Sequence, residues 1–187
     1  MEENKDKEVV KTLMVSSFNA SLDEKVNRAF RVKVHNIIPY HYFSSVSAES
    51  KDLFINGHYY GCISLCQAVA ESLSRFICSV NNVRLTKGCN TRINRLYAKN
   101  LISIQAKSAF EIIWGSDRNT FHHLNEDIIT VYQELMKRAE ECVNALYTIE
   151  AEIFAYKIIN NAIAPEKSIY WPKLINGKME ILLKPKF

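Results

Sequence analysis

The stretch that decides the fold is residues 58–80, HYYGCISLCQAVAESLSRFICSV. Apolar side chains recur in it every three or four residues, at Cys62, Cys66, Val69, Leu73, Phe76, Ile77 and Val80. This spacing follows the turn of an α-helix, so the stretch is predicted to be a helix with one buried face. Cys62, Cys66 and His58 could bind a metal, but the place of both cysteines in the apolar stripe favours a core role.

Helix signals continue upstream of this stretch. Ser21 and Glu24 form a capping box, and the helix they begin is expected to turn one apolar face inward, made of Val26, Ala29, Phe30 and Val34. The next helix is predicted over residues 41–56, with Phe43, Val46, Leu53 and Phe54 pointing inward. It stops at Asn56-Gly57, because glycine tolerates the left-handed backbone that ends a helix.

Downstream, two shorter helices are predicted over residues 91–100 and 103–114, the second closed by Gly115. The longest helix is expected to begin at Ser116 or Asp117 and to end near Asn160-Asn161, because no glycine or proline interrupts that stretch. In the tail, Asn176-Gly177 separates two β-prone runs, which predicts a hairpin of residues 168–175 and 178–183.

The composition excludes several classes of protein. Of the 187 residues, 48% are hydrophobic and 24% are charged, which is too apolar for a disordered chain. No apolar run is long enough to suggest a bilayer-crossing segment, and the charged first residues do not resemble a signal peptide. Five cysteines without a CxxC pair indicate a reduced, cytoplasmic protein, and no cofactor or membrane is expected.

Positive charge is concentrated in the middle of the chain. Residues 72–110 contain no acidic residue and seven basic ones, Arg75, Arg84, Lys87, Arg92, Arg95, Lys99 and Lys107. Such a stretch suits contact with a polyanion such as nucleic acid. It equally suits helices whose charges face an acidic neighbour within the same fold.

The residues that point to chemistry are 117–123, DRNTFHH, directly after the helix stop at Gly115. The start of a helix favours anions, and the planar guanidinium of Arg118 matches phosphate oxygens. His122 and His123 can move protons near neutral pH. Together these groups could cleave a phosphodiester without a metal. The structural alternative is a polar helix start. In that case Asp117 caps the helix, Arg118 pairs with Glu71 or Asp117, and the two histidines face solvent.

At this point the chain resembles the HEPN superfamily, whose hallmark is an arginine, four to six residues and a histidine, with a polar residue after the arginine. Arg118, Asn119 and His123 fit this pattern. The turn at Gly57 and the aromatic start of the following helix resemble the HEPN entry hairpin. Gln67 and Glu71 lie where many members carry polar residues that face the site. The resemblance covers roughly residues 40–160.

The resemblance implies a metal-independent endoribonuclease of a toxin or phage-defence system, with an RNA substrate and an inhibitory partner protein. His123 would be the acid or base, Arg118 would stabilise the phosphorane oxygens, and Asn119 would orient His123 or the phosphate. In-line cleavage needs one group that accepts a proton and one that donates it. A homodimer with a composite site would supply both.

Other features of the site remain open at this stage. Glu71 could orient Arg118 or His123, or form a surface pair with Arg75. His122 either assists catalysis, or it only packs or faces solvent. Some HEPN proteins carry a tyrosine two residues after the histidine that a partner enzyme modifies, and Asn125 stands there instead. Other members have lost catalysis and bind nucleotides, RNA or a partner protein.

The predicted fold class is therefore all-α, a HEPN-like helical bundle with a small C-terminal β-hairpin. The domains are expected to be an N-terminal helical extension (1–38), the bundle (39–164) and the hairpin tail (165–187). Tyr170, Trp171 and the tail lysines could hold RNA by stacking, although such a hairpin more often covers a sheet edge or a dimer seam.

Overall fold

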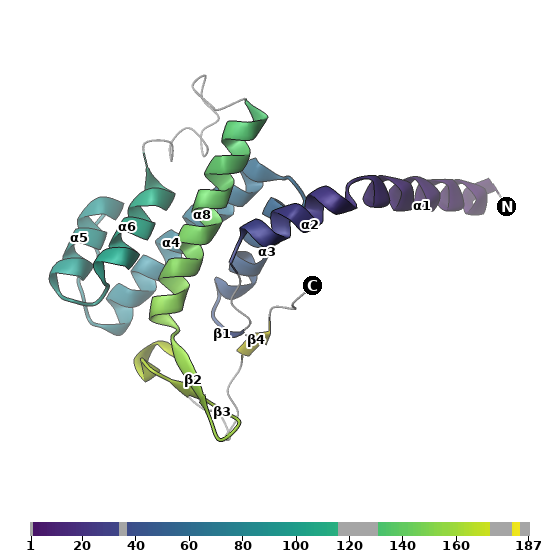
Figure 1. The fold of residues 1–187 in the computed structure, drawn as a ribbon. Helices are drawn as coiled ribbons and strands as arrows, with labels where there is room; N and C mark the ends of the chain where they lie inside the picture. The colour runs from purple at the N-terminus through teal and green to yellow at the C-terminus, as the bar shows by residue number, and fades with distance from the viewer. Residues whose placement is uncertain (1, 34–36, 116–130, 173–180, 184–187) are drawn as a thin grey trace.

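The computed structural model describes residues 2–33, 37–115, 131–172 and 181–183, and these are mostly helical (Figure 1). The helices are α1 (Glu2–Ala20), α2 (Leu22–Arg31), α3 (Ser44–Ile55), α4 (Tyr59–Val80), α5 (Cys89–Ala98), α6 (Ile104–Trp114) and α8 (Tyr132–Ile153). The strands are β1 (Ile37–Pro39), β2 (Tyr156–Ile159), β3 (Ala162–Pro165) and β4 (Ile181–Leu183), and a 3-10 turn covers Ser168–Tyr170.

The core is built around α4, which packs against α3, α6 and α8. Its apolar stripe is fully buried at Cys62, Cys66 and Leu73, as the spacing of these residues predicts. A hydrogen bond with Cys62 and burial both raise the pKa of the Cys66 thiol. The Cys66 thiol is therefore protonated, Cys62 is fully buried in the same stripe, and the core interpretation of the two cysteines is confirmed.

α4 is also long and apolar enough to cross a bilayer, by length and composition alone. The expectation that no stretch meets that test is therefore wrong. Half of the apolar window is buried inside the bundle, because α3, α6 and α8 cover it. This burial is the pattern of a core helix.

The predicted helices 41–56, 91–100 and 103–114 are confirmed within a few residues as α3, α5 and α6. Phe43 and Phe54 are buried as expected. α6 begins with Ser103, whose hydroxyl accepts a hydrogen bond from the amide of Ala106, and it ends at Gly115.

The predicted continuous helix from residue 116 to residue 160 is wrong at both ends. Val131 has extended backbone angles (φ −73°, ψ 114°), and α8 begins only after it. At the other end α8 stops at Ile153, and β2 and β3 form an antiparallel hairpin. Asn160 and Asn161 both have positive φ, 51° and 60°, so this dipeptide forms the hairpin turn that the sequence pattern assigned to a helix end.

The small C-terminal hairpin therefore exists but is formed by β2 and β3. Asn176-Gly177 lies outside the described residues. β4 pairs antiparallel with β1, with Ile38 opposite Leu182, and thus links the tail to the N-terminal part of the chain. Ser168–Tyr170 is a 3-10 turn instead of a strand. Tyr170 and Trp171 are buried against Phe76 and Phe154, which supports the structural interpretation of these two aromatic residues.

α2 differs from expectation as well. Ser21 makes no side-chain cap, because α1 precedes it and its hydroxyl donates back to the carbonyls of Ser17 and Phe18. The apolar face expected to point inward is largely outside, since Val26 is 44% and Phe30 88% exposed. The inward residue is Arg28, whose Nε donates to the carbonyl of Ile55 at 2.6 Å.

His41 ties the start of the bundle to the tail. Its ring lies among Phe43, Phe76 and Phe154, and Nε2 lies 3.0 Å from the carbonyl oxygen of Tyr170. Burial lowers the pKa of His41 below its usual 6.5, and the hydrogen bond to Tyr170 opposes the shift. The folded chain therefore holds the neutral imidazole, whose Nε2–H donates to Tyr170.

This burial predicts a pH dependence of stability. As the pH falls below about 6.5, the unfolded chain binds a proton at His41 before the folded chain does, so stability is lost on acidification. We expect the free energy of unfolding to fall less steeply between about pH 7.5 and pH 5.5 in His41→Phe than in the wild type. Urea titrations at each pH measure this slope. The exposed His58→Phe is the control, and identical slopes in all three proteins would contradict the assignment.

Candidate functional site

The residues expected to carry catalysis, Asp117, Arg118, Asn119, His122 and His123, lie outside the described residues. The structure describes the two helix ends that flank them. α6 ends at Trp114 and Gly115, α8 begins at Tyr132, and the two helices pack against each other (Figure 1). Residues 116–130 connect these ends, so covalent geometry tethers the cluster to this end of the helix pair.

A cation lies at the end of α6. A Cβ placed on Gly115 would meet Nη2 of Arg138 at 3.2 Å, so the guanidinium lies against this glycine. The carbonyl end of a helix carries partial negative charge, which favours a cation there. Arg138 is mostly buried and also pairs with Glu141 at 3.9 Å. The sequence analysis missed Arg138, because only the packing of α8 on α6 brings it beside Gly115.

Two polar atoms near the same helix end are buried without a hydrogen-bond partner in the described structure. They are Oε1 of Gln67, a residue only 1% exposed, and Nε1 of Trp114. The amide nitrogen of Gln67 donates to the carbonyl of Ile113 at 3.4 Å. A buried polar atom without a partner costs about 1–3 kcal/mol, and functional sites are one setting in which proteins keep such atoms. Gln67 is one of the positions that the HEPN resemblance assigns to the site.

Two tyrosines meet where α4 and α8 begin. The hydroxyls of Tyr59 and Tyr132 are 3.2 Å apart, and the rings are in tilted contact. Burial and then the hydrogen bond with Tyr132 raise the pKa of Tyr59 to about 12. Tyr59 is therefore protonated at neutral pH and serves as a hydrogen-bonding group rather than a base. Next to it, Gly57 has φ +82°, which confirms the predicted glycine turn.

Glu71 is held by two arginines. Its Oε1 accepts hydrogen bonds from Arg75 at 2.7 and 3.2 Å and lies 3.8 Å from Nη2 of Arg92. Arg92 is only 2% exposed and also donates to Ser74 and Thr86. The predicted pair between Glu71 and Arg75 is confirmed. The alternative role of Glu71, the orientation of Arg118 or His123, stays a prediction.

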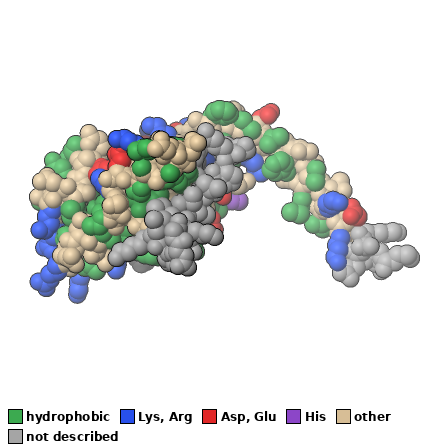
Figure 2. Space-filling model, turned by 90° about the horizontal axis from the view of Figure 1, so that it is seen from below, with side chains coloured by type: hydrophobic (Ala, Val, Ile, Leu, Met, Phe, Trp, Pro, Cys, Tyr) green, Lys and Arg blue, Asp and Glu red, His purple; other side chains and the backbone are tan. Residues whose placement is uncertain are grey.

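The basic stretch 72–110 divides into two parts. Arg75, Arg92 and Lys107 pair with carboxylates of the same fold, Glu71 and Glu111. Arg84 and Lys87 are exposed in the loop before α5, and Lys99 is exposed directly after α5. Lys and Arg side chains gather on this edge of the body, opposite the N-terminal helix (Figure 2). Arg75, Arg92 and Lys107 thus fit the interpretation of pairing within the fold. Arg84, Lys87 and Lys99 stay exposed, as contact with a polyanion would require.

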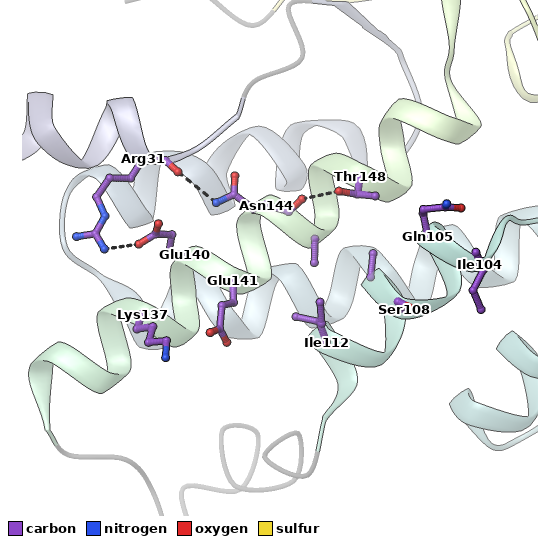
Figure 3. A pocket seen from close by; sticks show the side chains of 12 residues that line it. Arg31, Ile104, Gln105, Ser108, Ile112, Lys137, Glu140, Glu141, Asn144 and Thr148 are labelled. Atoms are coloured by element: carbon purple, nitrogen blue, oxygen red, sulfur yellow. Dashed lines mark hydrogen bonds and ion pairs between the residues drawn. The ribbon is translucent and has the colours of Figure 1, made fainter.

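An open groove of about 770 Å³ runs between α6 and α8 (Figure 3). At one side of the groove two contacts fix α2 to α8. The guanidinium of Arg31 pairs with Glu140 at 2.6 Å, and the backbone carbonyl of Arg31 accepts a hydrogen bond from the side-chain amide of Asn144. Apolar Ile104 and Ile112 line the other side. None of its described lining residues is a histidine or a cysteine, and none is a residue that the sequence analysis selected. The groove therefore has the shape of a ligand site without evident catalytic groups.

The part of the chain that the structure describes holds no group of three His, Cys, Asp or Glu side chains arranged for a metal ion. The chain matches no protein-family model, no curated protein and no solved structure.

The network at Glu71 predicts a stability effect. Glu71→Gln removes the carboxylate that faces buried Arg92, and we expect the free energy of unfolding to fall by about 1–3 kcal/mol. The matched control is Glu111→Gln, which breaks the exposed pair with Lys107 and should cost less than about 0.5 kcal/mol. Urea denaturation measures both values. Equal losses in the two variants would show that the Arg92 contact contributes nothing.

The turn between α3 and α4 predicts a backbone effect. Gly57→Ala places a Cβ on a residue with φ +82°, so we expect a loss of about 1–2 kcal/mol. Gly88→Ala is the comparison and should cost less, because Gly88 has an ordinary φ of −82° and a Cβ there meets only the side chain of Thr91, at 3.3 Å, apart from the weaker N-cap preference of alanine. Thermal and urea unfolding report the difference, which should vanish if the turn can relax without strain.

Proposed function

We propose that this chain is a metal-independent HEPN-type endoribonuclease that acts as a homodimer in a toxin or phage-defence system. Arg118, Asn119 and His123 would form the catalytic set, with Glu71, His122 and Asp117 in support. The proposal rests on the spacing of these residues and on the helical bundle with its Gly57 turn. An inhibitory partner protein belongs to the proposal, because a free ribonuclease of this kind would harm its own cell.

The observation that carries the proposal is the position of the cluster in the connection between two packed helix ends. Arg138 lies at the end of α6, and the unpartnered polar atoms of Gln67 and Trp114 are close by. The guanidinium and the indole N–H of Trp114 can both donate to a phosphate oxygen, whereas Oε1 of Gln67 accepts hydrogen bonds and suits a hydroxyl donor such as a ribose hydroxyl. The exposed cations Arg84, Lys87 and Lys99 would add long-range attraction for RNA.

The chemistry assigned to these residues is transfer of the phosphoryl group to the neighbouring 2′-hydroxyl. The 2′-oxygen attacks phosphorus, the P–O5′ bond breaks, and a 2′,3′-cyclic phosphate and a 5′-hydroxyl result. One imidazole removes the proton from the 2′-hydroxyl, and another donates a proton to the leaving 5′-oxygen. The guanidinium of Arg118 would stabilise the charge that develops on the phosphorane oxygens.

A non-catalytic HEPN module that binds nucleotide, RNA or a partner protein is the second candidate. One observation favours it: α8 begins at Tyr132, so the cluster does not open that helix as the sequence pattern suggested. The anion-binding advantage of a helix start therefore cannot be claimed from α8. In this candidate, RNA binds through the exposed cations near α5 and is not cleaved.

The two candidates predict different results with RNA. If the chain is a nuclease, His123→Ala should lower the rate of cleavage by about 10²–10⁴-fold, and Arg118→Ala by about 10²–10³-fold. Excess chelator should leave the wild-type rate unchanged. Gel analysis of labelled RNA pools measures the rate, and a test for 2′,3′-cyclic phosphate ends identifies the chemistry.

Controls for this experiment lie away from the cluster. His58→Ala removes an exposed imidazole, and Lys157→Ala an exposed cation on β2, and neither should change the rate. Circular dichroism verifies that every variant keeps its helices. RNA that binds to the wild type and to His123→Ala alike, without any cleavage product, would reject the nuclease and favour the binding module.

A further inference from the structure

Helix α5 and the loop before it form a surface without acidic side chains. Residues 72–110 contain no aspartate and no glutamate, and α5 lies at the edge of the body where lysine and arginine side chains gather (Figures 1 and 2). The face of α5 that packs inward consists of Arg92, Ile93 and Leu96. The other side of the helix faces solvent, and its side chains fall into two rows.

The first row on α5 carries positive charge. Thr91, Arg95 and Lys99 follow one another at intervals of four residues, so they lie along one side of the helix and its C-terminal end. The guanidinium of Arg95 donates to the backbone carbonyl of Arg84 at 3.1 Å, and this bond brings the loop residue Arg84 beside the row. We name Arg84, Arg95 and Lys99 the cationic row.

The charge of the cationic row is not neutralised by the part of the chain that the structure describes. Glu71 on α4 and Glu111 on α6 pair with other cations, and no described carboxylate forms an ion pair with the three residues of the row. The first turn of α5 has no acidic residue either, and the start of a helix adds partial positive charge. Such a surface attracts a polyanion.

The second row on α5 consists of two amides and an aromatic ring. Asn90, Asn94 and Tyr97 are spaced by four and three residues, so they also share one side of the helix. All three are exposed, and Tyr97 is 41% exposed. Nζ of Lys107 on α6 lies 5.8 Å from the centre of the Tyr97 ring, so this row runs along the side of α5 that faces α6. We name Asn90, Asn94 and Tyr97 the stacking row.

The two rows together match the chemistry of a single-stranded nucleic acid. Its phosphates need cations, and its unpaired bases stack on aromatic rings and hydrogen-bond with side-chain amides. Both rows extend along the same helix, which is roughly 15 Å long, so phosphates and bases of one strand can be held side by side. In a duplex the bases are paired and stacked inside, where Tyr97 does not reach them.

Two other anionic partners fit the surface less well. An acidic protein would use the cations but would have no need of the stacking row. A helix that binds a lipid surface needs an apolar face, whereas the exposed side of α5 is polar except for Tyr97 and Ala98. The combination of cations, amides and an aromatic ring therefore favours nucleic acid.

We propose that the exposed side of α5 binds single-stranded RNA, with the phosphates along the cationic row and the bases against the stacking row. The choice of RNA rests on the proposed function. The surface on α5 and the single-stranded form of the substrate are argued from the two rows and not from the nuclease chemistry. RNA binding at α5 and cleavage at residues 117–123 can therefore fail independently.

Fluorescence anisotropy of a labelled oligouridine tests the stacking row. The full chain with His123→Ala is the parent, so that cleavage does not consume the probe. Adding Tyr97→Ala should weaken binding about 5- to 100-fold, because one base loses its stacking partner, whereas Tyr97→Phe keeps the ring and should bind as the parent does. Tyr40→Ala, at a tyrosine outside α5 that is 53% exposed, is the matched control and should have no effect.

The salt dependence of the same binding tests the cationic row. Arg84→Ala with Lys99→Ala removes two phosphate contacts, so the slope of log affinity against log salt should become shallower by about 1.4. Alanine at residue 84 keeps the backbone carbonyl that holds Arg95. Lys11→Ala with Lys157→Ala removes the same charge from two exposed positions elsewhere and should leave the slope unchanged. Circular dichroism verifies that every variant keeps its helices.

Two further probes test the form of the strand. When the oligouridine is annealed to its complement, Tyr97→Ala should no longer change the affinity, because paired bases do not stack on the ring. A loss on the duplex as large as the loss on the single strand would contradict the stacking row. Oligothymidine of the same length should bind no more tightly than oligouridine, and tighter binding would overturn the choice of RNA.

Three other results would overturn the proposal. Unchanged oligouridine affinity in Tyr97→Ala would reduce α5 to a simple patch of charge. An unchanged salt slope in Arg84→Ala with Lys99→Ala would place the phosphates elsewhere. Binding to anionic vesicles without binding to oligouridine would assign the surface to lipid. If the wild type binds oligouridine through Tyr97 but never cleaves RNA, the nuclease fails and the α5 surface stands; cleavage with no effect of the α5 variants on binding gives the reverse.

Discussion

The burial of α4 is the constraint on which the rest of this structure depends. One face of a 22-residue helix excludes water only if α3, α6 and α8 surround it, so their packing follows from the composition of that single helix. This arrangement places the end of α6 next to the start of α8. It also decides which polar groups are carried inside, such as Gln67 and Arg92, because both lie on the buried faces of their helices.

The spacing of apolar residues predicted the helices that contribute to this core. It did not predict which helix faces are covered, or where the last helix ends. Residues 58–80 and 103–114 were predicted correctly, since a buried face repeats every three or four residues. The apolar face of α2 was assigned inward, but Phe30 is exposed, because periodicity identifies a stripe and does not say what covers it. Asn160-Asn161 was read as a helix end, although asparagine with positive φ forms a hairpin turn equally well.

For the candidate site, the sequence could select residue types but not the groups that fold in from elsewhere. Arg118, Asn119 and His123 were chosen because a guanidinium and an imidazole a few residues apart suit phosphate chemistry. Arg138 was not chosen, since nothing in the local sequence marks it, and only the packing of α8 brings it to Gly115. Glu71 was chosen for a role near the cluster, yet its contact with buried Arg92 depends on a residue far along the chain. Pairings of this kind depend on the tertiary fold, so the periodic pattern of the sequence does not predict them.

The proposed reaction sets a minimum number of proton-transfer groups, because in-line cleavage moves two protons. One group must accept the proton of the 2′-hydroxyl while another protonates the leaving oxygen, and one motif offers one clearly assigned imidazole, His123. A two-fold axis doubles every residue near it, so a second chain would complete the set without any further residue type.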